Sequence, residues 1–107
     1  MAFDPMAAAV DWLDAYRAGD IGAILNMYAD DVVTVCSCDG LTVLGKKGLR
    51  TYWEGRLRDY PASDLHDLRP HARGATISYN ACNRVIAATM EFNTEGRIRH
   101  LRCGPSK

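Results

Sequence analysis

Residues 12–32 read WLDAYRAGDIGAILNMYADDV, and this stretch decides the fold. Its apolar side chains recur at helical spacing as far as Tyr16, and Gly19 offers the left-handed residue that commonly ends a helix. Asp20 can cap a second helix directly afterwards, because the apolar positions between residues 21 and 28 fall on one helical face. The stretch therefore predicts two helices that meet at one sharp corner.

The flanks of this stretch predict where the first helix begins and where a strand follows. The Asp4 carboxylate can accept hydrogen bonds from the N–H groups of a first turn, and the ring of Pro5 presets the backbone angle of a first helical position. Asp30 and Asp31 end the second helix. Residues 32–38, which are rich in β-branched side chains, then predict a strand.

A hairpin and a third helix follow. Asp39 and Gly40 are typical of a tight turn, and residues 41–44 predict the short return strand. A helix over about residues 46–60 has an apolar face made of Leu49, Tyr52, Trp53, Leu57 and Tyr60. Five basic side chains oppose the single acid Glu54 here, and we expect them on a solvated helix face. They are Lys46, Lys47, Arg50, Arg56 and Arg58.

Beyond Pro61 the pattern changes to the alternation that is typical of strands. Four runs separated by turn residues predict an antiparallel meander. These are residues 65–69, 76–80, 85–92 and 97–103. Alternation places Ala88, Met90, Leu101 and Cys103 inward, and Glu91, His100 and Arg102 outward. We therefore expect a single α+β domain over residues 1–107, in which a curved antiparallel sheet packs against three helices of the N-terminal half.

Composition narrows the classes of function. The 107 residues suffice for one domain, and a formal net charge of zero disfavours nucleic-acid binding. No apolar run approaches the ~20 residues of a membrane span, and no basic segment precedes the apolar N-terminal residues, so we expect a cytoplasmic protein that does not bind membranes. In that compartment the four cysteines, Cys36, Cys38, Cys82 and Cys103, are expected to be thiols.

The pattern resembles a known family. The run from Trp12 to Asp20, followed by residues 25–32, is similar to the nuclear transport factor 2-like superfamily, and more narrowly to its SnoaL-like and ketosteroid-isomerase-like branch. Gly45 before a helix that carries Tyr52 and Trp53 also fits. The resemblance implies a cone-like (cystatin-like) sheet, an apolar pocket between sheet and helices, and frequent homodimers that pair through the open sheet face.

The resemblance also shows which chemistry is missing. A ketosteroid isomerase needs a tyrosine donor, a carboxylate base and a protonated aspartic acid. Aligned on the matching motifs, these three positions fall on Trp12, Cys36 and Ala88. Isomerisation by that mechanism is therefore not expected.

Several residues are candidates for a site in the cone. Pocket-lining residues expected from the fold are Trp12, Tyr16, Tyr28, Cys36, Trp53, Ala88, Met90, Leu101 and Cys103. Cys36, Cys38 and Cys103 could gather there as a nucleophile or soft-metal site, although packing as small hydrophobes is the simpler interpretation and the spacing predicts no metal. Asp39 and Cys36 are the weak catalytic candidates, and a turn residue is the simpler interpretation of Asp39.

Two functions remain open from the sequence. One is binding of a small apolar molecule in the cone pocket, with or without catalysis. The other is a non-enzymatic, homodimeric association domain whose pocket is filled. No glycine loop of the phosphate-cradling kind is present, so no nucleotide and no other cofactor is predicted.

Overall fold

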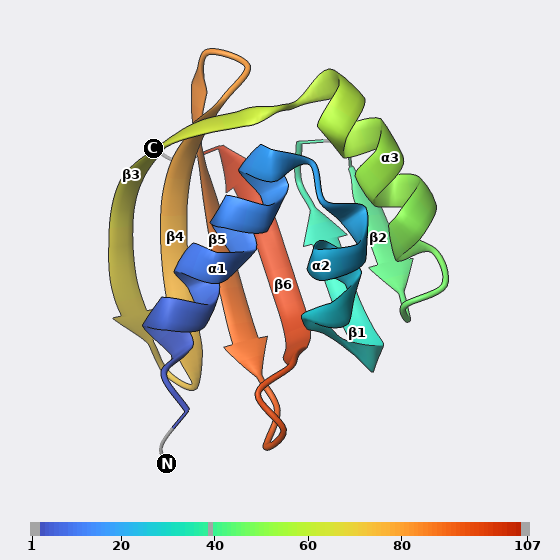
Figure 1. Ribbon diagram of the computed structural model, residues 1–107, viewed down its shortest axis with the longest axis vertical. Coiled ribbons are helices and arrows are strands. Elements are labelled where there is room, and N and C mark those ends of the chain that lie inside the picture. Colours follow the sequence, from blue (N-terminus) through green and yellow to red (C-terminus); the bar gives the residue numbers. More distant parts are fainter. Residues whose placement is uncertain (1–2, 39, 106–107) are drawn as a thin grey trace.

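A computed structural model describes residues 3–38 and 40–105 and shows an α+β arrangement of two layers. Three helices lie on one face of a six-stranded, curved, open sheet whose strand order is β2-β1-β6-β5-β4-β3 (Figure 1). The elements are α1 (Pro5–Ala18), α2 (Ile21–Asn26), β1 (Tyr28–Cys36), β2 (Leu41–Leu44), α3 (Leu49–Asp59), β3 (Ala62–His71), β4 (Gly74–Ala81), β5 (Arg84–Phe92) and β6 (Ile98–Pro105). No helix in the described part of the chain is both long and apolar enough to cross a bilayer.

The helical corner forms as predicted. The Asp4 carboxylate accepts hydrogen bonds from the backbone N–H groups of Met6 and Ala7, at 3.0 and 3.3 Å. Gly19 ends α1 with a φ of 70°, where only glycine avoids strain. Asp20 then caps α2 by accepting from the N–H of Ala23 at 3.1 Å. These local bonds fix the direction of both helices.

The prediction for the end of the second helix is wrong. Helix α2 stops at Asn26, and Tyr28 is the first residue of β1 rather than part of the helical face. Tyr28 pairs with Ile98 of β6, and the N–H of Ile98 donates to the carbonyl of Met27 at 2.8 Å. Pairing with β6, which is distant in sequence, therefore draws Tyr28 into a strand, although the spacing of its apolar neighbours would also suit a helix.

The predicted antiparallel meander is confirmed, and one strand pair elsewhere departs from the antiparallel arrangement expected for the whole sheet. Strands β3, β4, β5 and β6 follow one another antiparallel, but β1 and β6 pair in parallel. Register shifts interrupt the pairs β1–β6, β3–β4 and β5–β6, and such irregularities bend a strand and increase its twist. The curvature lets one sheet wrap the helices.

The remaining boundaries differ from the predicted ones by a few residues, most of all in β3, which is ten residues long. Helix α3 begins at Leu49 instead of Lys46. The predicted turn at Asp39 and Gly40 cannot be compared, because Asp39 lies outside the described residues.

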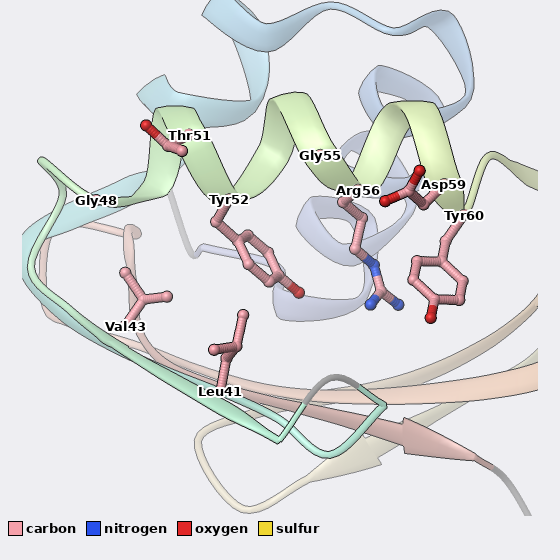
Figure 2. Close-up of a pocket in the computed structure, with 9 residues that line it drawn as sticks. All are labelled: Leu41, Val43, Gly48, Thr51, Tyr52, Gly55, Arg56, Asp59 and Tyr60. Atoms are coloured by element: carbon pink, nitrogen blue, oxygen red, sulfur yellow. The ribbon is translucent and has the colours of Figure 1, made fainter.

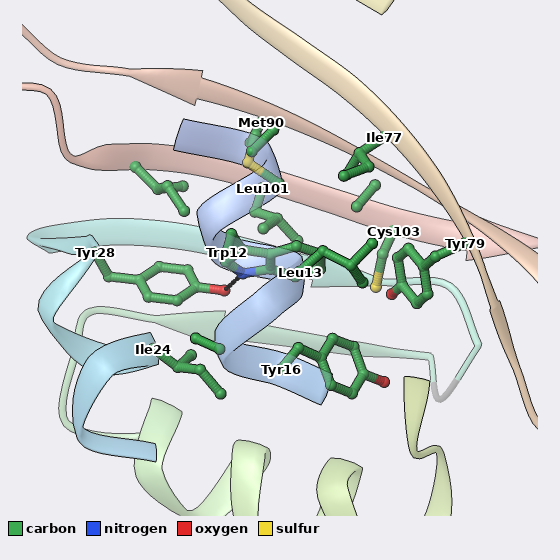
Figure 3. Packing of buried hydrophobic residues seen from close by; sticks show 14 of the residues in the cluster. Trp12, Leu13, Tyr16, Ile24, Tyr28, Ile77, Tyr79, Met90, Leu101 and Cys103 are labelled. Carbon is green, nitrogen blue, oxygen red and sulfur yellow. Dashed lines mark hydrogen bonds between the residues drawn. The ribbon is translucent and has the colours of Figure 1, made fainter. Parts of the chain in front are cut away.

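An aromatic cluster fills the space between the helices and the sheet (Figure 3). The rings of Trp12, Tyr16, Trp53 and Tyr79 meet edge to face, with centroids 4.7–5.8 Å apart. The indole N–H of Trp12 donates to the Tyr28 hydroxyl at 3.1 Å, so both polar atoms are satisfied inside the core. The predicted inward strand positions are confirmed, since Ala88, Met90, Leu101 and Cys103 are all buried.

Gly74 makes the closest backbone approach in the sheet. A Cβ atom on Gly74 would lie 1.7 Å from the Met90 carbonyl oxygen on β5. We expect Gly74→Ala to lower the free energy of unfolding by about 3 kcal/mol or more, because two paired strands must move apart. The measurement is urea unfolding followed by circular dichroism.

Gly22 provides the matched control for this prediction. It is exposed on α2, and an added Cβ would come no closer than 3.7 Å to the Asp20 carboxylate. Gly22→Ala should therefore raise the free energy of unfolding by about 0.5–1 kcal/mol. Equal effects of the two substitutions would contradict the close approach at Gly74.

Candidate functional site

A cavity of about 420 Å³ lies between α3 and the β2 strand. Its lining residues are Leu41, Val43, Gly48, Thr51, Tyr52, Gly55, Arg56, Asp59 and Tyr60. In Figure 2 the side chains of Tyr52, Arg56 and Tyr60 point from the helix toward the sheet, and the Tyr52 ring lies above Leu41. The absence of a side chain at Gly48 brings the helix close to the strand, since a Cβ there would lie 3.0 Å from a methyl of Val43.

One wall of this cavity is a buried arginine. Arg56 is only 3% exposed and directs each guanidinium nitrogen at a different acceptor. Its Nε donates to the Tyr16 hydroxyl at 3.2 Å, its Nη1 to the Cys36 sulfur at 3.2 Å, and its Nη2 to the Tyr79 hydroxyl at 3.4 Å. The guanidinium carbon also lies 5.1 Å from the centre of the Tyr60 ring.

No carboxylate neutralises this arginine within residues 3–38 and 40–105. The ion pairs there are Arg58 with Asp59 and Arg69 with Asp67, and none of these four side chains is buried. A buried cation without a counter-ion is costly, and a guanidinium does not escape by losing its proton. Arg56 therefore gives the inner end of the cavity a strong preference for negative charge.

The surrounding tyrosines stay protonated. Burial raises the pKa of Tyr16 to about 12, although the Arg56 charge opposes the shift. Burial also raises the pKa values of Tyr28, Tyr52 and Tyr79. Tyr16 remains a neutral hydroxyl that accepts from Arg56 and donates to the Tyr60 carbonyl oxygen. The tyrosines therefore supply hydrogen-bonding dipoles but no charge.

Two of the predicted thiols meet at this site. Cys36 and Cys103 are register partners on β1 and β6, and both are buried. A hydrogen bond with Cys36, and then burial, raise the pKa of the Cys103 thiol. The Tyr52 hydroxyl lies 3.8 Å from the Cys103 sulfur. Cys38 follows the end of β1 and is only partly buried, outside this register. No cluster of three or more His, Cys, Asp or Glu side chains suited to a metal ion occurs in the described part of the chain.

The structure places the predicted pocket residues in the core. All nine are buried and belong to one hydrophobic cluster, and they are Trp12, Tyr16, Tyr28, Cys36, Trp53, Ala88, Met90, Leu101 and Cys103. Figure 3 shows part of this cluster, including Trp12, Tyr16 and Tyr28. None of them lines the cavity between α3 and β2, although Tyr16, Cys36 and Cys103 contact residues that do. The catalytic candidate Asp39 lies outside the described residues.

Arg56 is the residue that the sequence interpretation missed, and its assignment to a solvated face is wrong. The signal was available in the spacing. Arg56 lies seven residues after Leu49, four after Tyr52 and three after Trp53, so it falls on the same helical face as the apolar residues. A charged residue inside an apolar stripe points to a buried polar site.

Comparison with known proteins supports the fold. A family model described as a SnoaL-like domain matches residues 6–104. A SnoaL-like protein of unknown function from Burkholderia thailandensis has a similar structure, with a TM-score of 0.85, 20% sequence identity, and 96% of this chain and 95% of that chain covered.

Two further solved structures are similar over most of the chain. An NTF-2 like protein of unknown function from Burkholderia xenovorans has a TM-score of 0.74 and 20% identity, with 94% of this chain and 81% of that chain covered. A protein from Kribbella flavida has a TM-score of 0.81 and 19% identity, with 94% and 85% covered. No curated protein matches this chain in sequence. At these identities the structures establish the fold alone.

The isolated charge of Arg56 leads to a stability prediction. Replacing a buried ionic group with an apolar one of similar length is often nearly neutral, because the cost of burying the charge disappears. We expect Arg56→Met to lower the free energy of unfolding by no more than about 2 kcal/mol, which reflects the hydrogen bonds lost by Tyr16 and Tyr79. Urea unfolding measures this value.

Arg50, exposed on the same helix, is the control. Arg50→Met should change the free energy of unfolding by no more than about 0.5 kcal/mol. A loss above about 4 kcal/mol for Arg56→Met would mean that the guanidinium is retained because it holds the core together, and not because a ligand needs it.

The raised pKa of Tyr16 predicts that the folded protein loses stability at alkaline pH. An unfolded tyrosine ionises near pH 10, whereas Tyr16 in the folded protein ionises near 12. Between these values the unfolded state has released the proton and the folded state has kept it, so the free energy of unfolding falls as the pH rises from about 10 to 12. Tyr16→Phe should make this fall less steep in denaturant titrations at a series of pH values. An unchanged slope would show that Tyr16 titrates normally.

Proposed function

We propose, from the premise that this chain belongs to the SnoaL-like domain family, that it binds a small molecule with an apolar body and an anionic head group. The cavity between α3 and β2 is the binding site in this proposal. The head group lies against the guanidinium of Arg56, and the body lies between the helix and the strand.

The observation that carries the proposal is the buried guanidinium of Arg56 on the cavity wall, without an ion pair to any described carboxylate. A bound carboxylate or similar oxyanion would remove the cost of that charge. The planar guanidinium also matches such groups geometrically. A site for a purely apolar ligand would not require a charged arginine in its wall.

The side of the cavity formed by β2 is the reason for proposing that the ligand has an apolar body. Leu41 and Val43 on β2 face the rings of Tyr52 and Tyr60, and Leu41 is 48% exposed. Apolar and aromatic walls with one directing charge are typical of small-molecule sites. A volume of about 420 Å³ suits a molecule of one or two rings.

The proposal includes no isomerisation by a carboxylate base. The positions that would carry its donor, base and acid hold Trp12, Cys36 and Ala88. The indole N–H of Trp12 is engaged with Tyr28 inside the core and is not directed at the cavity.

Cinnamate and cinnamamide test the role of charge, because they share one apolar body and only the carboxylate is negative at neutral pH. We expect calorimetric titration to show cinnamate binding at least about tenfold more tightly than cinnamamide, which corresponds to one desolvated charge-assisted contact. Arg56→Met should abolish that preference.

Arg50→Met should preserve the preference for cinnamate, since Arg50 is exposed and does not line the cavity. Equal binding of both compounds to the wild-type protein, or an undiminished preference in Arg56→Met, would refute the proposed orientation of the ligand.

A second candidate function is a homodimeric association domain. The filled core favours it, because the centre of the cone is occupied by the rings of Trp12, Tyr16, Trp53 and Tyr79. In this alternative the open face of the sheet pairs with a second copy. Sedimentation velocity over a hundredfold range of concentration distinguishes the two: a stable dimer that binds neither probe supports association, and a monomer that binds cinnamate contradicts it.

A further inference from the structure

We propose that Cys36 and Cys103 form a redox modification site, at which a hydroperoxide oxidises Cys36 and Cys103 then closes an intramolecular disulfide. The proposal does not depend on the binding of an anionic ligand. It rests on the strand register, on the contact with Arg56 and on the position of the cavity.

The register brings the two sulfurs within bonding reach. Cys36 of β1 and Cys103 of β6 are direct partners in the parallel pair, and both side chains face the buried side of the sheet. Neighbouring strands lie about 4.8 Å apart, and disulfides form across Cα separations of about 4.4–6.8 Å. Arg56 contacts the Cys36 sulfur and Tyr52 contacts the Cys103 sulfur from neighbouring positions on α3, so both sulfurs face the same helix. Both cysteines carry unoxidised thiols in this structure.

The surroundings make the two thiols unequal. Arg56 donates from Nη1 to the Cys36 sulfur at 3.2 Å, and an adjacent guanidinium favours the thiolate, the form that attacks peroxides. Cys103 keeps its proton, because its hydrogen bond with Cys36 and its burial raise the pKa of its thiol. Cys36 is therefore the attacking sulfur and Cys103 the resolving one.

The chemistry balances with a hydroperoxide as the oxidant. The Cys36 thiolate attacks one peroxide oxygen and the O–O bond breaks, which gives a sulfenic acid and, after uptake of one proton, an alcohol or water. The Cys103 sulfur then attacks the sulfenic sulfur. The S–O bond breaks, and the hydroxyl leaves with the Cys103 proton as water. Two thiols lose two electrons in total, and the peroxide gains them.

The cavity gives the oxidant a route to sulfurs that are almost fully buried. Cys36 is 1% exposed and Cys103 is 3% exposed. Arg56 and Tyr52 line the cavity, and each contacts one of the two sulfurs. In this proposal hydrogen peroxide, which has only two heavy atoms, reaches the sulfurs when the Arg56 and Tyr52 side chains move aside.

The other two cysteines provide internal controls. Cys82 is exposed on the turn between β4 and β5, where its thiol donates to the carbonyl of Asp59 at 2.8 Å. Cys38 is partly buried beyond the end of β1. Neither lies opposite another cysteine in the sheet register of the described residues.

The experiment uses the Cys38→Ser/Cys82→Ser protein, in which only the proposed pair can react. The reduced, folded protein receives one equivalent of hydrogen peroxide and is then alkylated and weighed intact. We expect a mass lower by two hydrogens with no alkylation. After tryptic digestion, we expect a cross-link between the peptides of residues 18–46 and 103–107.

Each other outcome overturns the proposal. Gain of oxygen without a cross-link would show that Cys103 does not resolve the sulfenic acid. A disulfide between two molecules would show that the pair does not react internally. Two alkylated thiols would show that the folded protein excludes peroxide. A cross-link that forms only in denaturant would likewise show that peroxide does not reach the pair in the folded protein.

Arg56 acts as a positioning residue, so its effect is read from the rate and its pH dependence. Arg56→Met should slow disulfide formation at neutral pH by about tenfold or more and move the rate profile to higher pH, because less thiolate is present. The charged and titratable groups facing Cys36 are Arg56, Cys103 and Tyr52. Arg50→Met should leave the profile unchanged. Failure of cinnamate to bind, together with normal disulfide formation, would remove only the proposed ligand function.

Discussion

The buried guanidinium of Arg56 is the constraint on which the rest of the site depends. Through Tyr16, Cys36 and Tyr79 it links α3 to α1, β1 and β4. The guanidinium group is rigid and planar, so its three hydrogen bonds can form in only a few geometries. The helices and strands that carry the acceptors must therefore keep their relative positions while these bonds are made. No described carboxylate balances its charge, and for that reason the same residue is central both to the proposed anion site and to the proposed reactivity of Cys36.

The packed core and the cavity occupy different parts of the space between the helices and the curved sheet. The aromatic side chains of α1 and α3 fill the middle of the layer between helices and sheet. The cavity lies beside this core, between α3 and the short β2 strand, and its lining runs along the length of α3. The proposed ligand site therefore lies beside the filled core, and not among the residues that the family resemblance had suggested as pocket lining.

Several sequence expectations held because they depend on nearest neighbours. The cap at Asp4, the left-handed Gly19 and the cap at Asp20 need only residues within one helical turn. The inward positions of Met90 and Leu101 needed only the two-residue alternation of a strand. The candidate site was harder to predict, because its central residue carries a charge in a stretch whose charges suggest a solvated face.

The sequence by itself thus determined the α+β class, the helical corner and the faces of the strands, since local hydrogen bonds and side-chain periodicity specify these features. Only the tertiary structure decided that β1 pairs in parallel with β6, that Tyr28 leaves the helix, and that Arg56 lies among aromatic rings. Each of these depends on contacts between residues far apart in the chain. Such contacts win when the burial and hydrogen bonds they provide exceed a local preference of a fraction of a kcal/mol per residue.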